Sequence, residues 1–261
     1  MAKARKPATP MWRPDSAKVR RVIDRLSAQH PDAWTELAFT TPYELLVATV
    51  LSAQSSDVRV NGVTPALFTR YPNARALARA TTDELEPQIQ PTGFFRAKSR
   101  ALAALSSALV ERHGGDVPST MEELTALPGV GRKTANVVLG HAFGIPGLPV
   151  DLHVLRVANR IGIAKSEAPE VVEAQLTGAL PDSRWVKASD TLILHGRRIC
   201  RPKPMCDRCA VRTDCDYYRA LGPSAVPASS RSKSVKTSAP KPAGTPSKPA
   251  RKAAAGRKAR S

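Results

Sequence analysis

The stretch that decides the fold of this chain is LPGVGRKTANVVL, residues 127–139. Gly129 and Gly131 flank one apolar residue, Val130, and glycine permits the positive φ angles of a tight turn. Val130 can therefore pack into a core while the backbone N–H groups around it face outward. A helix is predicted to begin at once, and its free N–H groups and positive dipole end face the same way. The stretch predicts a surface that binds phosphate without side-chain charge.

Two other phosphate-binding motifs come close to this stretch and fail. A P-loop needs Gly-Lys-Thr in direct succession, whereas Arg132 separates Gly131 from Lys133. The dinucleotide-binding pattern needs a preceding strand and a third glycine, where this chain has Thr134. The alternative that stays open is a plain helix-turn-helix corner.

The sequence around the stretch is helical in pattern from residue 18 to residue 220. Apolar residues recur there at helical spacing, and no convincing alternating strand occurs. The predicted fold class is all-α, with about nine or ten helices joined by short loops. Capping signals predict helix starts at residues 41–44, 81–84, 119–122 and 166–169. Glycines predict the helix ends, at Gly93, Gly114, Gly115, Gly129, Gly144 and Gly162.

The net charge of +18 is concentrated at the two ends of the chain. Residues 1–20 hold six Lys or Arg and one acid, and residues 222–261 hold ten and none. The composition of residues 1–17 and 221–261 predicts basic disordered arms, with Trp12 packing locally. Such arms attract nucleic acid through counterion release, or serve only to keep the chain in solution. No run of 18 apolar residues and no signal peptide occur, so we expect a cytoplasmic protein that does not cross a membrane.

All four cysteines of the chain fall within sixteen residues, in the pattern C-x5-C-x2-C-x5-C. Disulfides are rare in the cytosol, so a metal site is expected. One compact loop with four thiolates fits a [4Fe–4S] cluster better than zinc, which usually takes two pairs from separate turns. Zinc stays the alternative. The predicted ligands are Cys200, Cys206, Cys209 and Cys215.

LPGVGRKTANVVL resembles the helix-hairpin-helix of the DNA glycosylase superfamily, and within it the endonuclease III family. The resemblance covers residues 18–220 and includes further motifs in the family's order. These are LLVATVLSAQSSDVRVN (45–61), TGFFRAKS (92–99), VDLHVLRVANR (150–160), LILHGRRIC (192–200) and the cysteine cluster.

The resemblance implies two α-helical domains with DNA between them. Residues 35–145 would form a six-helix domain with the helix-hairpin-helix at about 121–143. Residues 18–34 and 146–220 would form the iron–sulfur domain, carrying the [4Fe–4S] cluster. The family's first cysteine gap has six residues and this chain has five, so the first loop must turn differently. It carries Arg201 and Lys203, which the cluster would hold against DNA phosphates, and His195 would support the cluster or the packing.

The resemblance assigns catalysis to Lys133 and Asp151. Lys133 would attack C1′ of the damaged nucleotide as a neutral amine, which requires destabilising its ammonium by about 3–5 kcal/mol. The helix end supplies about 0.3–1 kcal/mol, so burial and Arg132 or other cations must supply the rest. Read alone, Lys133 would be a surface lysine on phosphate and Asp151 a helix N-cap. The family usually has Thr where this chain has Leu152, and His153 is either near the site or structural.

A glycosylase must rotate its target nucleotide out of the stack and fill the space left behind. The resemblance places Gln54 at the filling position and Phe94 at the wedge position. Phe95 is the alternative ring, and ordinary core packing is the alternative role for Gln54 and Phe94. The remaining predicted DNA contacts lie in the hairpin: Gly129, Val130, Gly131 and Arg132.

The function implied is a base-excision-repair glycosylase with AP lyase activity. It would act as a monomer on double-stranded DNA of the nucleoid that carries damaged bases or abasic sites. The substrates implied are oxidised or ring-saturated pyrimidines. A related adenine glycosylase for mispairs lacks a lysine at the position of Lys133 and adds a C-terminal domain, which residues 221–261 do not resemble. A non-catalytic DNA-binding module with an iron–sulfur cluster is the alternative from another class.

Overall fold

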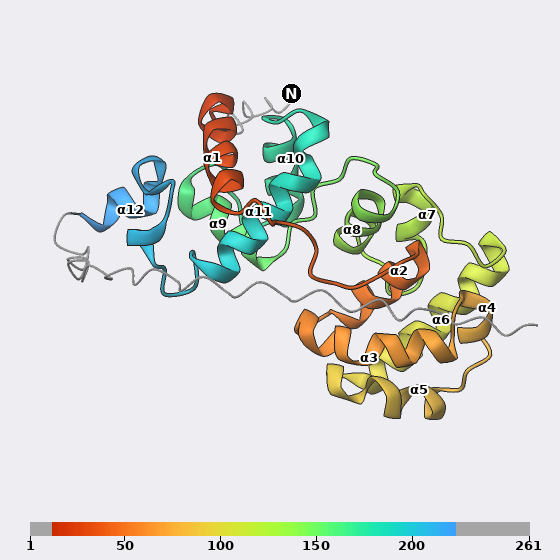
Figure 1. Cartoon of the computed structure of the whole chain (residues 1–261). Helices are drawn as coiled ribbons and strands as arrows, with labels where there is room; N and C mark the ends of the chain where they lie inside the picture. The colour runs from red at the N-terminus through yellow and green to blue at the C-terminus, as the bar shows by residue number, and fades with distance from the viewer. Residues whose placement is uncertain (1–11, 223–261) are drawn as a thin grey trace, which may run out of the picture. The chain divides into compact units, whose positions relative to one another are not determined.

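The computed structural model describes residues 12–222 and confirms an all-α fold, since this part of the chain holds helices and no strand (Figure 1). The predicted arms at residues 1–17 and 221–261 lie almost wholly outside the described residues. The first helix nevertheless begins at Ser16, two residues before the predicted start, because the Asp15 side chain accepts a hydrogen bond from the Ala17 N–H. Trp12 lines a cavity with residues 13–14 and 16 and with the helix Pro169–Thr177, so part of its surroundings comes from a distant segment.

More helices occur in the described residues than the nine or ten expected, because short helical turns join the long ones. The α-helices are α1 (Ser16–Gln29), α2 (Pro42–Leu51), α3 (Asp57–Arg70), α4 (Ala74–Leu77), α5 (Thr82–Ile89), α6 (Phe95–His113), α7 (Met121–Thr125), α8 (Arg132–Ala142), α9 (Leu152–Ile161), α10 (Pro169–Thr177), α11 (Trp185–Arg198) and α12 (Asp216–Leu221). Four 3₁₀ turns complete the set: η1 (Gln90–Thr92), η2 (Asp182–Arg184), η3 (Cys206–Arg208) and η4 (Arg212–Asp214).

The predicted capping signals start their helices. Thr41 accepts a hydrogen bond from the Glu44 N–H at 3.2 Å with Pro42 in the first turn, and Thr81 forms a capping box with Glu84. Thr120 caps α7, whereas α10 begins without a side-chain cap bond. Each glycine predicted to end a helix has a positive φ angle, and Gly114 and Gly162 are the left-handed C-caps of α6 and α9.

The buried apolar residues form two separate clusters. One runs from Leu37 to Leu139 and is built by α2 to α8. The other joins α1 to residues 148–215, where α1 packs on α11 and α9 packs on both α11 and α12. Figure 1 shows α1, in red, beside the blue-green helices that follow it by more than a hundred residues.

The sequence predicted two domains, residues 35–145 and residues 18–34 plus 146–220. This division stays a prediction, and it requires two core clusters of this kind. Helix α8 begins at Arg132 and carries Lys133. It belongs to the first cluster and also contacts α11 of the second. The residues at this contact therefore come from both clusters. Among residues 12–222, no helix has the length and apolar character needed to span a membrane.

Candidate active site

The hairpin between α7 and α8 has one glycine with a positive φ, not two. Gly129 has φ +76°, whereas Gly131 is extended at φ −92° and forms the N-cap of α8. Val130 is buried, as expected, and its N–H donates to the Leu127 carbonyl at 3.2 Å. That bond removes one of the N–H groups expected to face phosphate. A Cβ added at Gly131 would meet no atom within 4 Å, so its outer side is open to an approaching backbone.

Lys133 lies in the first turn of α8, as predicted, and lines a cavity together with Asp151. Part of the Lys133 side chain is exposed to solvent. Protein atoms nevertheless surround its amino group, and this desolvation lowers the pKa of Lys133. The charge of Arg197 lowers the pKa further, whereas Asp151 and Asp57 raise it. The net shift is downward, which favours the neutral amine.

Burial and a cation lower this pKa, as expected, but the cation is Arg197 and Arg132 is not among the charges that act on Lys133. The Nε and Nη2 atoms of Arg132 each donate to a different carboxylate oxygen of Glu173 on α10, both at 2.8 Å. Asn136 also donates to Glu173, at 3.2 Å. The charge of Arg132 is therefore paired, and Arg197 from α11 is the cation that acts on Lys133. Arg132 as a DNA contact stays a prediction.

Asp151 is the N-cap of α9. Its Oδ1 atom accepts the N–H groups of His153 and Val154, both at 2.8 Å. The helix-cap role is thus real, and it fixes the carboxylate in the cavity that contains Lys133. Leu152 is exposed, and His153 packs against Gly196 of α11, where a Cβ would come within 2.9 Å of its Cβ. These contacts give His153 a structural role.

Arg197 and Asp57 connect the two clusters at the cavity wall. Arg197 Nη1 donates to Asp57 Oδ2 at 2.7 Å, and the same nitrogen contacts Glu36. Sequence reasoning missed both residues. The sequence held part of the signal for Arg197. Asp190 and Arg197 are polar residues at helical spacing on the face of α11 that also carries apolar Ile193 and Leu194.

Gln54 and Phe94 share an unusual backbone conformation. Within residues 12–222 they are the two residues other than glycine with a positive φ, at 53° and 50°. Such a conformation costs about 1–3 kcal/mol and is concentrated at functional sites. Both side chains are exposed, Phe94 at 66%, whereas Phe95 packs against the first core cluster. Of the two rings, Phe94 is the one free to reach a ligand, and its contact with DNA stays a prediction.

The four cysteines are free thiols that line a single small cavity. Burial raises the pKa of Cys206, Cys209 and Cys215, that of Cys209 to about 11. Thiolates held there need a cationic partner to compensate for the desolvation. Among residues 12–222, no group of three or more Cys, His, Asp or Glu side chains has the arrangement of a single-ion site.

Two side chains from outside the loop hold the cysteines in place. His195 is fully buried, with Nε2 3.6 Å from Cys209 Sγ and Nδ1 3.0 Å from His30 Nε2. Arg160 donates to the carbonyls of Arg201 and Pro202 at 2.6 and 3.1 Å, and its Nη1 lies 3.8 Å from Cys200 Sγ. Arg201 and Lys203 are exposed on the first cysteine gap. The shortened gap is therefore stabilised by Arg160.

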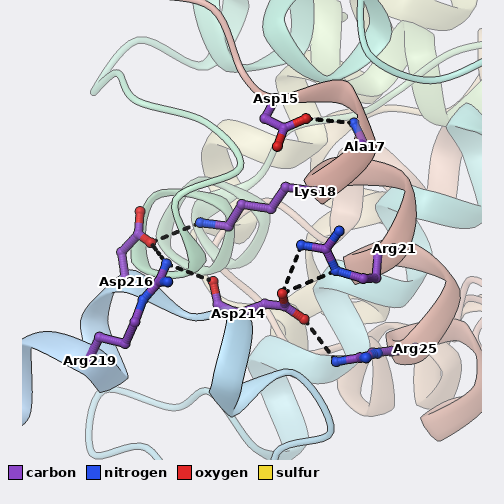
Figure 2. Close-up of polar contacts among 8 residues, drawn as sticks. All are labelled: Asp15, Ala17, Lys18, Arg21, Arg25, Asp214, Asp216 and Arg219. Carbon is purple, nitrogen blue, oxygen red and sulfur yellow. Dashed lines mark hydrogen bonds and ion pairs between the residues drawn. The ribbon is translucent and has the colours of Figure 1, made fainter.

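The far side of the cysteine loop is bound to α1 by charged groups (Figure 2). Arg21 and Arg25 both donate to Asp214, each at 2.9 Å, and Lys18 donates to Asp216 at 2.8 Å. Arg219 of α12 also reaches Asp216. The contacts of Lys18, Arg21 and Arg25 join residues almost 200 positions apart and attach the segment around Asp214 to α1.

Comparison with known proteins identifies the family. Residues 47–182 match the family described as HhH-GPD superfamily base excision DNA repair protein. The endonuclease III of Synechocystis is 48% identical over 197 residues, which are 75% of this chain and 90% of that protein. The chain belongs to the endonuclease III family. The endonuclease III of Escherichia coli K12 is 39% identical over 204 residues, 78% of this chain and 97% of that protein.

Solved structures agree with the family. A trapped endonuclease III–DNA covalent intermediate superposes with a TM-score of 0.76 at 37% identity, covering 79% of this chain and 98% of that one. A thermostable thymine-DNA glycosylase, at 21% identity and a TM-score of 0.72, shares the fold. The chain is therefore a base-excision-repair enzyme, a DNA glycosylase with AP lyase activity, as the sequence predicted.

Proposed function

We propose that this enzyme removes oxidised or ring-saturated pyrimidines from double-stranded DNA through a Schiff base on Lys133. The observation that carries the proposal is the lowered pKa of Lys133 in a cavity shared with Asp151, at the start of the second hairpin helix. A neutral amine is a nucleophile, and an ammonium is not. The solved relative described as a trapped covalent intermediate with DNA supports the same chemistry.

The chemistry begins with base release. The Nζ lone pair forms a bond to C1′ while the bond from C1′ to the base breaks, and its electron pair leaves with the base, which gains a proton. Asp151 stabilises the positive charge that develops at C1′ and accepts a proton from the attacking nitrogen. The sugar ring then opens to give the protonated Schiff base.

Strand cleavage follows from the same intermediate. Loss of a proton from C2′ sends its electrons toward the iminium and breaks the bond from C3′ to the phosphate oxygen. Water then hydrolyses the Schiff base and returns Lys133. The iminium acts as the electron acceptor of the elimination, so the cut falls 3′ to the abasic site.

The hairpin and the two strained residues would place the DNA. Gly129 and Gly131 present backbone to phosphate, and the N-terminus of α8 adds its dipole. Phe94 would wedge into the stack and Gln54 would occupy the space of the everted nucleotide, because both are exposed in conformations that the fold must hold against strain. We expect a monomer acting in the cytoplasm.

The cysteine loop fits a [4Fe–4S] cluster. Four thiols line one cavity, their burial disfavours the free thiolates, and His195 and Arg160 contact the sulfur atoms. Cys200, Cys206, Cys209 and Cys215 would hold the cluster, which supplies no step of the reaction and orders the loop that bears Arg201 and Lys203.

A panel of defined duplexes tests the proposal, scored separately for base release and strand cleavage. Pyrimidine lesions should lose the base and be cut, and abasic sites should be cut. Release of adenine from mispairs without cleavage would instead indicate the related adenine glycosylase. Binding with neither reaction would indicate a non-catalytic module and overturn the proposal.

A further inference from the structure

The cavity that contains Lys133 and Asp151 extends to residues that the proposed chemistry does not use. Lys133, Val137 and His141 follow one another at four-residue intervals on one face of α8, and all three line it. Asp190 on α11 and Trp34, before α2, line it as well. The space inside it that water-sized spheres can occupy is about 60 Å³, enough for a few water molecules, and the cavity is open to solvent on one side.

His141 and Asp190 form a buried pair in this cavity wall. His141 Nε2 lies 3.3 Å from Asp190 Oδ1, and the two side chains are 2% and 4% exposed. The other polar atom of each side chain, His141 Nδ1 and Asp190 Oδ2, has no hydrogen-bond partner. Buried polar atoms in native proteins are nearly always paired, and exceptions call for a ligand or a functional role. Both atoms are almost fully shielded from solvent, so a ligand in the cavity reaches them only when side chains of the cavity wall shift.

Trp34 is the aromatic residue of this cavity. Its ring stands edge-on to His141, with centroids 4.7 Å apart and planes at 72°. The residue is 55% exposed, which is unusual for a tryptophan that has an apolar core nearby. An exposed indole beside a polar pair offers what a nucleobase needs, a flat face for stacking and groups for its edge.

We propose, resting on the function proposed above, that Trp34, His141 and Asp190 bind the everted base and select thymine- or uracil-derived lesions over cytosine-derived ones. Trp34 supplies the stacking face. Asp190 Oδ2, an acceptor, takes the N3–H that thymine- and uracil-derived bases carry. A cytosine-derived base presents a lone pair at N3, which repels the carboxylate. His141 Nε2, 3.3 Å from Asp190 Oδ1, orients this carboxylate.

Single-turnover base release from duplexes containing dihydrouracil or 5-hydroxycytosine tests this pocket. The wild type should prefer dihydrouracil, and Asp190→Asn should lower the ratio of the two rates by about tenfold or more, the usual worth of a base-edge contact. Cleavage of an abasic duplex should fall by less than about threefold, because that substrate has no base to read. Asp116→Asn, an exposed carboxylate in the loop after α6, is the matched charge control and should keep the wild-type ratio.

Trp34→Ala covers the case in which Asp190→Asn fails to fold, because Trp34 is exposed. It should slow release of both bases by about tenfold, a lost stacking contact, and Trp34→Phe should restore most of the rate. An unchanged lesion ratio in folded Asp190→Asn, or equal losses on lesion and abasic duplexes in Trp34→Ala, would overturn the pocket. A wild type that cuts no abasic DNA would instead refute the underlying function.

Discussion

Arg197 on α11 and Lys133 on α8 line the same cavity, and the positive charge of Arg197 lowers the pKa of Lys133. Asp151 acts on the same amine in the opposite direction. Beside desolvation and the charge of Asp57, the protonation of the nucleophile thus depends on two residues borne by helices of the second core cluster, although Lys133 itself belongs to a helix of the first.

This relationship predicts opposite shifts in the pH dependence of covalent trapping. The neutral amine forms as the pH rises through the pKa of Lys133, so trapping should increase with pH and level off. The midpoint of this increase should lie below 10.5, the ordinary pKa of a lysine. Arg197→Gln removes a cation and should move the midpoint to higher pH. Asp151→Asn removes an anion and should move it to lower pH. Trapping rates on abasic DNA between neutral and alkaline pH measure both, and shifts in the same direction would contradict the assignment.

The strain at Gln54 predicts a separation of stability from activity. Gln54→Gly relieves a left-handed conformation and should raise the free energy of unfolding by about 1 kcal/mol. Gln54→Ala keeps the strain and should not. Both lose the side chain and should slow base release by about tenfold or more, because the vacated space in the duplex is left unfilled. Denaturant unfolding and single-turnover release test this, and a wild-type rate in both variants would exclude Gln54 from base eversion.

The contacts of α1 predict how the cysteine loop is retained. Asp214→Ala leaves Arg21 and Arg25 without their partner and should lower the free energy of unfolding by about 1 kcal/mol, since both arginines are half exposed. The hydrogen bond from Arg21 lowers the pKa of Asp214, so this contribution is complete above pH 3.8 and is lost as the pH falls through the folded pKa.

The same variant should release iron to a chelator faster than the wild type. Asp116→Ala, which removes an exposed carboxylate from the loop after α6, is the control and should release iron at the wild-type rate. Equal rates in all three proteins would mean that α1 does not hold the loop.

The ten cations of residues 222–261 lie outside the described residues, and their sequence alone predicts diffuse binding to DNA. If about three to five of them engage at once, a 1–221 truncation should make the slope of log K against log salt shallower by about 3–4 units. Lesion preference should stay the same, because the hairpin and Lys133 are untouched. Salt titrations on damaged and undamaged duplex measure both. Equal slopes for the full chain and the truncation would mean that the tail does not bind DNA and serves to keep the chain in solution.

Features that depend on local sequence could be predicted. The caps at Thr41 and Thr81 act within one turn, and the helix-ending glycines act through their own φ angles, so both were legible. The placement of Asp151 at the start of a helix was legible for the same reason.

Features that depend on contacts between distant segments could not be predicted. Arg132 and Lys133 are neighbours, but Glu173 on α10 pairs with Arg132 and leaves Arg197 to act on Lys133. The resemblance placed the wedge at Phe94 but left Phe95 open as the exposed ring, because that choice depends on which ring the first core cluster accommodates. The shortened cysteine gap was legible, whereas its support by Arg160 was not.

Borohydride trapping on an abasic duplex, followed by peptide mapping of the cross-linked lysine, tests the central claim most directly. The wild type should trap, with the DNA attached to Lys133. Lys133→Gln should form no trapped complex while binding the same duplex within about threefold, because the hairpin that contacts phosphate is unchanged. A Lys133→Gln protein that traps as well as the wild type, or a cross-link mapped to another lysine, would contradict the account.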